Sequence, residues 1–194
     1  PQTGAAAWVA VGRMRAMAND PPGALDAARR AISFDARNEE AALLTLEIMG
    51  PGLPLAEALV RSVIDTNPTR GLRTGYARVL LDAGRAADAL VQLQRLTVEQ
   101  PDFPPGWLTL GLLQLQEGLL SAAETSLKRY LEIARVAGSE DSQRARTEAL
   151  LGLSQIAEKR KDFSGAQQWL SQIDDPGEVM AVVLRQASIL ARQG

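Results

Sequence analysis

The chain has 194 residues, of which 46% are hydrophobic, and it carries a formal net charge of −2 with a sequence pI of about 5.3. This composition is typical of one or two folded domains. It shows no block of basic residues and no run of 18 apolar residues, the footprints of nucleic-acid binding and of a membrane span. Cys and His are both absent, which excludes disulfides, thiolate nucleophiles and Cys or His metal ligands. We therefore expect no enzyme, no cofactor and no metal site.

Apolar residues recur with a helical period along the whole chain, and Gly or Pro interrupts them. This pattern predicts an all-α fold of about eleven antiparallel helices, grouped in pairs. The predicted segments are residues 5–38, 37–69, 70–103, 104–137, an insertion at 138–146, then 147–179 and a half-unit at 180–194. The second segment is the most degenerate. Because the last resembles half a unit, we interpret the chain as a fragment of a longer array, or its last helix as a cap.

Small and apolar residues recur at an interval of 34 residues, which is the period of the predicted pairs. The matched positions are Ala77 and Gly111, Gly84 and Gly118, Ala89 and Ala123, and Leu93 and Leu127, while Trp8, Gly12 and Ala24 match Trp107, Gly111 and Ala123 in the same frame. Two helices cross closely only where side chains are small. We therefore expect Gly12 and Gly111 at crossings with their second helices, and Gly84 and Gly118 at turns.

These residues resemble the tetratricopeptide repeat family, whose unit is a 34-residue helix-turn-helix with an early Trp, small crossing residues and a closing Pro. The resemblance covers nearly the whole chain. It implies a right-handed α-solenoid of stacked antiparallel helix pairs, with residues 1–194 forming a single array. It also implies a non-enzymatic scaffold or adaptor that binds a peptide or helix of a partner protein in a concave groove lined by the first helices.

Groove positions carried over from the family fall on first-helix residues of this chain. They are Val9 and Arg13, Ala41 and Thr45, Thr74 and Arg78, Leu108 and Leu112, and Leu151 and Gln155. None is Lys or Asn, so the clamp with which one subclass holds a C-terminal carboxylate is absent. Arg13 and Arg78 are expected to meet an acidic partner.

An apolar strip is expected beside these arginines. Leu108, Leu112 and Leu115, with Leu81 one repeat away, would receive an amphipathic helix or an apolar peptide. The alternative is that neighbouring helices bury the strip. The candidate partner-binding residues are thus Arg13, Arg78, Leu81, Leu108, Leu112, Leu115, Leu151 and Gln155.

Other conspicuous motifs are interpreted as structural. Asp174 and Asp175 are adjacent, and neighbours in sequence do not face each other on a helix, so "QIDDPG" predicts a helix end and a turn. The "GPG" of residues 50–52 lacks the strand and the Lys-Ser/Thr of a phosphate loop and predicts a helix terminator. The charged insertion suits a solvated helix extension or a loop, with a specific contact site as the alternative.

Two further functions remain open beside the scaffold. The chain could be the non-catalytic repeat module of a larger enzyme, or a self-assembling envelope protein that forms homo-oligomers through the ends of the solenoid. Its composition and repeats resemble bacterial multi-repeat tetratricopeptide proteins, many of which are exported, periplasmic or lipid-anchored at the envelope. We expect such a location, while a cytoplasmic one stays open. No nucleic acid or membrane span is expected.

Overall fold

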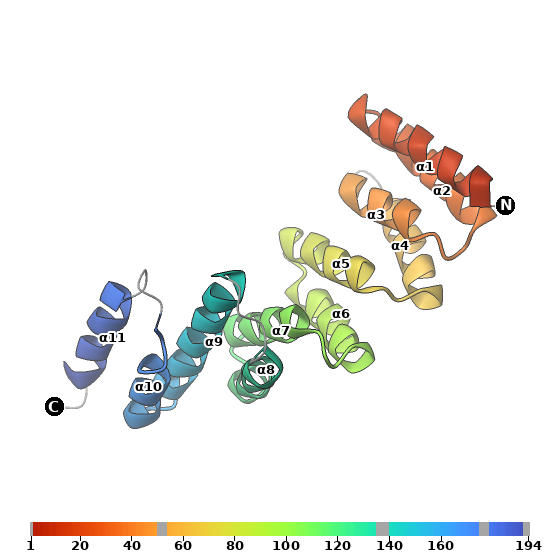
Figure 1. Ribbon diagram of the computed structural model, residues 1–194. Coiled ribbons are helices and arrows are strands. Elements are labelled where there is room, and N and C mark those ends of the chain that lie inside the picture. The colour runs from red at the N-terminus through yellow and green to blue at the C-terminus, as the bar shows by residue number, and fades with distance from the viewer. Residues whose placement is uncertain (1, 50–53, 135–139, 175–178, 192–194) are drawn as a thin grey trace. The chain divides into compact units, whose positions relative to one another are not determined.

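The computed structural model describes residues 2–49, 54–134, 140–174 and 179–191, and every regular element among them is a helix (Figure 1). The helices are α1 (Gln2–Met17), α2 (Pro21–Phe34), α3 (Glu39–Ile48), α4 (Pro54–Thr66), α5 (Arg70–Asp82), α6 (Ala86–Glu99), α7 (Pro104–Gln116), α8 (Leu120–Ile133), α9 (Glu140–Lys159), α10 (Phe163–Leu170) and α11 (Val179–Ala191). Helices consecutive in the chain pack as antiparallel pairs, such as α1 with α2 and α7 with α8. The predicted all-α fold of paired helices is confirmed.

Several helices begin at a side chain that accepts a hydrogen bond from the first turn. Asn38, for example, accepts from the backbone N–H of Ala41 at 2.9 Å. Such a cap satisfies one of the backbone donors that a helix start leaves unpaired. The capping residues are Asp20, Asn38, Thr69 and Asp162. Short polar residues therefore mark where second and first helices start.

Glycine ends two of the first helices. Gly84 after α5 and Gly118 after α7 have φ of 73° and 75°, in the left-handed region that costs a side chain energy. The backbone N–H of the following residue, Arg85 or Leu119, turns back to the last turn of the helix, on Leu80 and Gln114. The expectation that Gly84 and Gly118 form turns is confirmed.

The glycines predicted at helix crossings are packed against larger neighbours. A Cβ on Gly111 would lie 2.7 Å from Leu127 Cδ2 of α8, and one on Gly12 would lie 3.4 Å from the Ala24 carbonyl oxygen of α2. Ala24 and Leu127 are fully buried. The 2.7 Å distance at Gly111 is too short for a Cβ, so the approach of α7 to α8 depends on glycine. The 3.4 Å distance at Gly12 is ordinary van der Waals contact, and the tight neighbour of Gly12 is Leu44 Cδ2 of α3, at 2.5 Å.

The chain divides into two compact units, Pro1–Leu96 (unit 1) and Thr97–Gly194 (unit 2). In unit 1, the first helices α1, α3 and α5 contact one another in order. In unit 2, α7 contacts α9, and a core cluster forms between α7, α8 and α9. Its fully or nearly buried members are Leu115, Ala123, Leu127, Tyr130, Ala149, Leu153 and Ile156. Each unit thus has its own apolar interior.

The structure describes the charged insertion and the predicted helix terminators only in part. Residues 140–146 of the insertion are helical and form the first turns of α9, so this part of it extends a helix. The "GPG" of residues 50–52 and Asp175 lie outside the described residues. The repeat boundaries therefore stay a prediction for those segments.

Candidate partner-binding surfaces

The arginines expected to meet an acidic partner are both exposed in unit 1. Arg13 on α1 donates to Glu40 on α3 across 3.3 Å, and both side chains are more than half exposed. Arg78 lies exposed on α5, while Leu81, one turn further along α5, is half-buried. An exposed ion pair contributes little to stability because water and salt screen it. The pair of Arg13 with Glu40 is therefore a weak surface contact.

Other groove positions of unit 1 lie in the core instead. Val9 and Ala41 pack in one cluster with Ala31. Thr45 is fully buried, and its hydroxyl donates to the Ala41 carbonyl oxygen at 2.8 Å. These side chains are covered where α1 and α3 contact each other. Their main role is therefore packing.

The three leucines of the predicted strip in unit 2 separate into two groups. Leu108 and Leu112 are partly exposed and rest against the core cluster of unit 2. Leu115 is only 5% exposed. A Cβ on Gly152 of α9 would lie 3.5 Å from Leu115 Cδ2 and 3.6 Å from Leu112 Cδ2, which shows how closely α9 approaches α7. Burial by a neighbouring helix, the alternative for the strip, describes Leu115.

The next first helix, α9, carries the remaining two candidates. Leu151 is half-buried against the cluster that contains Ala157 and Leu170, and Gln155 is also half-buried. Leu108 and Leu112, like Leu151 and Gln155, are four residues apart and so share one side of their helix. We define the unit 2 first-helix surface as Leu108, Leu112, Leu151 and Gln155.

A polar network in unit 1 joins three helices that the sequence does not bring together. Glu57 on α4 accepts from the Tyr76 hydroxyl of α5 at 2.6 Å, from Arg61 Nη2 at 2.7 Å and from Arg85 Nη1 at 2.8 Å. Arg85 also donates to Asp88 on α6 at 2.7 Å. The hydrogen bonds from Arg85 and then from Tyr76 lower the pKa of Glu57 from 4.5 to about 2.

The network is built to hold charge rather than to move protons. Burial, followed by the hydrogen bond to Glu57, raises the pKa of the Tyr76 hydroxyl. A carboxylate with a pKa near 2 stays ionised at neutral pH and is a poor general base. The spacing of Glu57 and Arg61 by four residues signals a local pair. Tyr76 and Arg85 lie 19 and 28 residues from Glu57, so nothing local reveals them.

Metal-ligand clusters and membrane-spanning helices are two further kinds of functional feature. Within residues 2–49, 54–134, 140–174 and 179–191, no group of three acidic, Cys or His side chains is placed to hold a metal ion. In the same part of the chain, no helix is long and apolar enough to cross a membrane.

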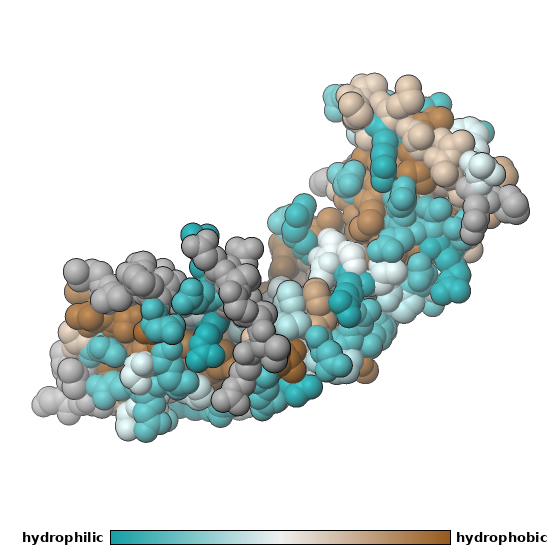
Figure 2. Space-filling model, in the orientation of Figure 1, coloured by the Kyte–Doolittle hydropathy of each residue, from teal (hydrophilic) through white to brown (hydrophobic). Residues whose placement is uncertain are grey.

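Apolar side chains are exposed on α11 of unit 2. Val182 and Ile189 are buried against α10, whereas Val183 is 51% and Leu184 is 64% exposed. Figure 2 shows brown, apolar surface over α11. This helix thus has one covered face and one face with apolar groups in contact with water.

Comparison with known proteins finds similarity in structure only. No family model matches the sequence, and no curated protein matches it. A tetratricopeptide repeat protein from Parabacteroides merdae ATCC 43184 matches with a TM-score of 0.63 and 15% identity, over 96% of this chain and 72% of that one. The chain has the tetratricopeptide-repeat fold.

Two further solved structures agree with this fold. YrrB, described as a tetratricopeptide-repeat protein with an unusual peptide-binding site, has a TM-score of 0.63 and 15% identity, over 93% of this chain and 90% of YrrB. PilF of Pseudomonas aeruginosa has a TM-score of 0.57 and 16% identity, over 98% and 88% of the two chains. At such identities the tetratricopeptide-repeat likeness establishes the fold, and function has to be argued from the surfaces.

Proposed function

We propose that this chain is a non-enzymatic tetratricopeptide-repeat scaffold that binds a segment of a partner protein on its first helices. The observation that carries the proposal is the unit 2 first-helix surface. Its leucines are partly exposed although their helices α7 and α9 pack against each other. Partly exposed apolar groups at helical spacing are what an amphipathic helix or an apolar peptide requires of a receptor.

The side chains exposed on the two units differ in chemistry, so each unit would bind a different kind of partner segment. On unit 2, Leu108, Leu112 and Leu151 offer apolar contact, and the Gln155 amide can donate and accept hydrogen bonds beside them. On unit 1, Arg13 and Arg78 offer exposed guanidinium groups to carboxylates. A partner segment with apolar residues for α7 and α9 would satisfy unit 2, and an acidic segment would satisfy unit 1.

Leu112→Glu tests this function in the full chain. A charge at this position opposes apolar contact, so we expect the partner captured from host extract to be lost while far-UV circular dichroism stays that of the parent. Leu119→Glu is the matched control, because Leu119 is 47% exposed and precedes α8. Capture by both variants would contradict the proposal. Unfolding of Leu112→Glu alone would assign Leu112 to the core.

A second candidate function is favoured by α11. Exposed Val183 and Leu184 provide an apolar face through which copies of the chain can associate. Light scattering over a range of concentrations measures this directly. Dimers that Leu184→Glu abolishes would support self-association, and a monomer at every concentration would remove it.

A further inference from the structure

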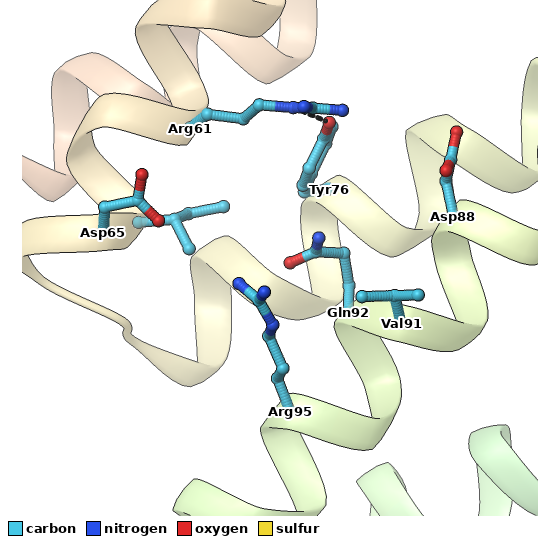
Figure 3. Close-up of a pocket in the computed structure, with 8 residues that line it drawn as sticks. Arg61, Asp65, Tyr76, Asp88, Val91, Gln92 and Arg95 are labelled. Carbon is cyan, nitrogen blue, oxygen red and sulfur yellow. Dashed lines mark hydrogen bonds between the residues drawn. The ribbon is translucent and has the colours of Figure 1, made fainter.

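A polar pocket of about 380 Å³ lies in unit 1 between the second helices α4 and α6, away from the first-helix positions discussed above (Figure 3). Its polar lining consists of Arg61 and Asp65 from α4, Tyr76 from α5, and Asp88, Gln92 and Arg95 from α6. This pocket is not part of the proposed function. Its lining is rich in hydrogen-bond donors, and two of them, Arg61 and Gln92, are oriented by residues that do not line the pocket.

Arg61 is held at one wall. Its Nε donates to the Tyr76 hydroxyl at 2.9 Å, and its Nη2 donates to Glu57 at 2.7 Å. Figure 3 shows the Arg61 side chain extended across the pocket toward Tyr76. These bonds fix the guanidinium plane while leaving its remaining N–H groups free to donate. An arginine fixed in this way loses little entropy when it binds a carboxylate.

Gln92 is oriented from below by a buried cation. Arg73 of α5 is 4% exposed, and its Nη1 donates to Gln92 Oε1 at 3.0 Å. Because the amide oxygen accepts this bond, the amide nitrogen is the end of Gln92 that can act on a ligand, and it can only donate.

Arg95 supplies the opposite wall. It lies exposed on α6, and Figure 3 shows its side chain pointing into the pocket from the side opposite Arg61. In the described part of the chain, none of the ion pairs within 4.0 Å includes Arg95. A cation that points into the pocket and makes no ion pair is available to a ligand.

The aspartates limit which anion the pocket selects. Asp65 and Asp88 line it together with the two arginines, so the formal charges of the lining cancel. A doubly charged phosphate would face two carboxylates, whereas a singly charged, planar carboxylate can bind the guanidinium groups in the fork geometry they prefer. Asp88 is already paired with Arg85, so a basic group next to the bound carboxylate would pair with Asp65.

We propose that the α4–α6 pocket binds the side-chain carboxylate of a Glu or Asp residue in a partner peptide, with a neighbouring basic residue placed against Asp65. The carboxylate lies between Arg61 and Arg95 and accepts from the Gln92 amide. The binding is sequence-specific in charge pattern, and it uses second helices of the solenoid.

The test uses the nitrogen-15-labelled full chain and short capped peptides. The probe is acetyl-Ala-Lys-Glu-Lys-Ala-amide, compared with the same peptide carrying Gln or phosphoserine in place of Glu. The Nε–H signals of Arg61 and Arg95 report on the pocket. We expect saturable shifts of both signals with the Glu peptide and none with the Gln peptide. Tighter binding of the phosphoserine peptide, or no saturable shift at millimolar peptide, would overturn the proposal.

A pair of variants separates the pocket from general electrostatic attraction. Arg95→Gln removes one wall and should weaken the Glu peptide about tenfold, the loss that follows from one charge-assisted contact. Arg144→Gln removes an exposed arginine of α9 outside the pocket and should leave the affinity unchanged. Equal losses in the two variants would show that net charge alone attracts the peptide. Because neither substitution touches the unit 2 first-helix surface, capture of the apolar partner is an independent result.

Discussion

Helices α4 to α6 of unit 1 and helices α7 to α9 of unit 2 connect successive helix pairs by different means. In unit 1, the ionised carboxylate of Glu57 on α4 bonds to Tyr76 on α5 and to Arg85 at the start of α6. In unit 2, Leu127 of α8 packs between two glycines, since a Cβ on Gly111 of α7 or on Gly152 of α9 would lie within 2.8 Å of its side chain. The Glu57 connection consists of directional, charge-assisted hydrogen bonds. The Leu127 connection consists of close apolar packing.

The difference shows that the tetratricopeptide-repeat fold restricts which residues lie at the crossing within a helix pair. It restricts less the residues that connect one pair to the next, a contact that we call the joint. Small residues lie at helix crossings in both units, such as Gly12 and Ala24 in unit 1 and Gly111 and Ala123 in unit 2. What lies between pairs depends on chemistry that each unit supplies for itself. A polar joint depends on pH and tolerates little change of charge, whereas an apolar joint depends on packing volume and is insensitive to pH.

Leu127→Ala should have the largest effect on stability. Leu127 is fully buried and fills the space beside both Gly111 and Gly152. We expect the free energy of unfolding, measured in urea, to fall by about 2–5 kcal/mol. The matched variant is Leu44→Ala in unit 1, since Leu44 is 2% exposed and packs against Gly12. Leu44→Ala should also cost about 2–5 kcal/mol, and a cost near zero in either variant would contradict the packing of leucine against glycine.

Gly111→Leu should come next, because it adds volume to the same crossing. Even a Cβ at this position would lie 2.7 Å from Leu127 Cδ2 and 3.2 Å from its backbone nitrogen. We expect a loss of about 1–3 kcal/mol from overpacking, seen as a lower melting temperature by circular dichroism. Thr109→Leu adds similar volume at an exposed position of α7 and should leave melting nearly unchanged. An unaltered melting curve for Gly111→Leu would be incompatible with the crossing.

Glu57→Gln tests the polar joint of unit 1 and should have the smallest effect of the three. The amide keeps the shape of Glu57 but loses its charge-assisted bonds, so we expect a cost of about 1–2 kcal/mol, reduced by the partial exposure of the carboxylate. Glu40→Gln is the control, because the Glu40 side chain is 65% exposed in its pair with Arg13. Its effect on unfolding should be close to zero.

The destabilisation caused by Glu57→Gln should depend on pH, and the pKa of Glu57 fixes the direction of this dependence. The pKa of Glu57 is lowered from 4.5 to about 2 by folding, so its stabilisation is complete above 4.5 and is lost as the pH falls toward 2. The difference in unfolding free energy between parent and Glu57→Gln should therefore shrink across that interval. The cost of Leu127→Ala should show no comparable trend, and a parallel trend in both would remove the distinction between the joints.

Much of the fold follows from spacing alone. The 34-residue interval between Gly84 and Gly118 predicts two turns with the same geometry, and both glycines have it. The pairing of small residues at Gly12 and Ala24 follows from the same register. A local repeat carries this information because each helix pair is specified by residues near one another in the chain.

The surfaces could not be predicted in the same way. Whether Leu115 faces water depends on the approach of α9, which comes after a non-periodic insertion. The Glu57 network and the pair of Arg13 with Glu40 join residues 19 to 28 positions apart in different helices. Exposure and charge pairing are properties of the stacked helices together, and a single repeat does not contain them.

Site-specific photocrosslinking tests the central claim, that first helices bind the partner, most directly. A photoreactive amino acid replaces Leu112 in one sample and Leu119 in another, and both are irradiated with the captured partner. The account predicts a covalent product from position 112 and none from position 119. Crosslinking from position 119 alone, or from neither position while the partner remains bound, would contradict it.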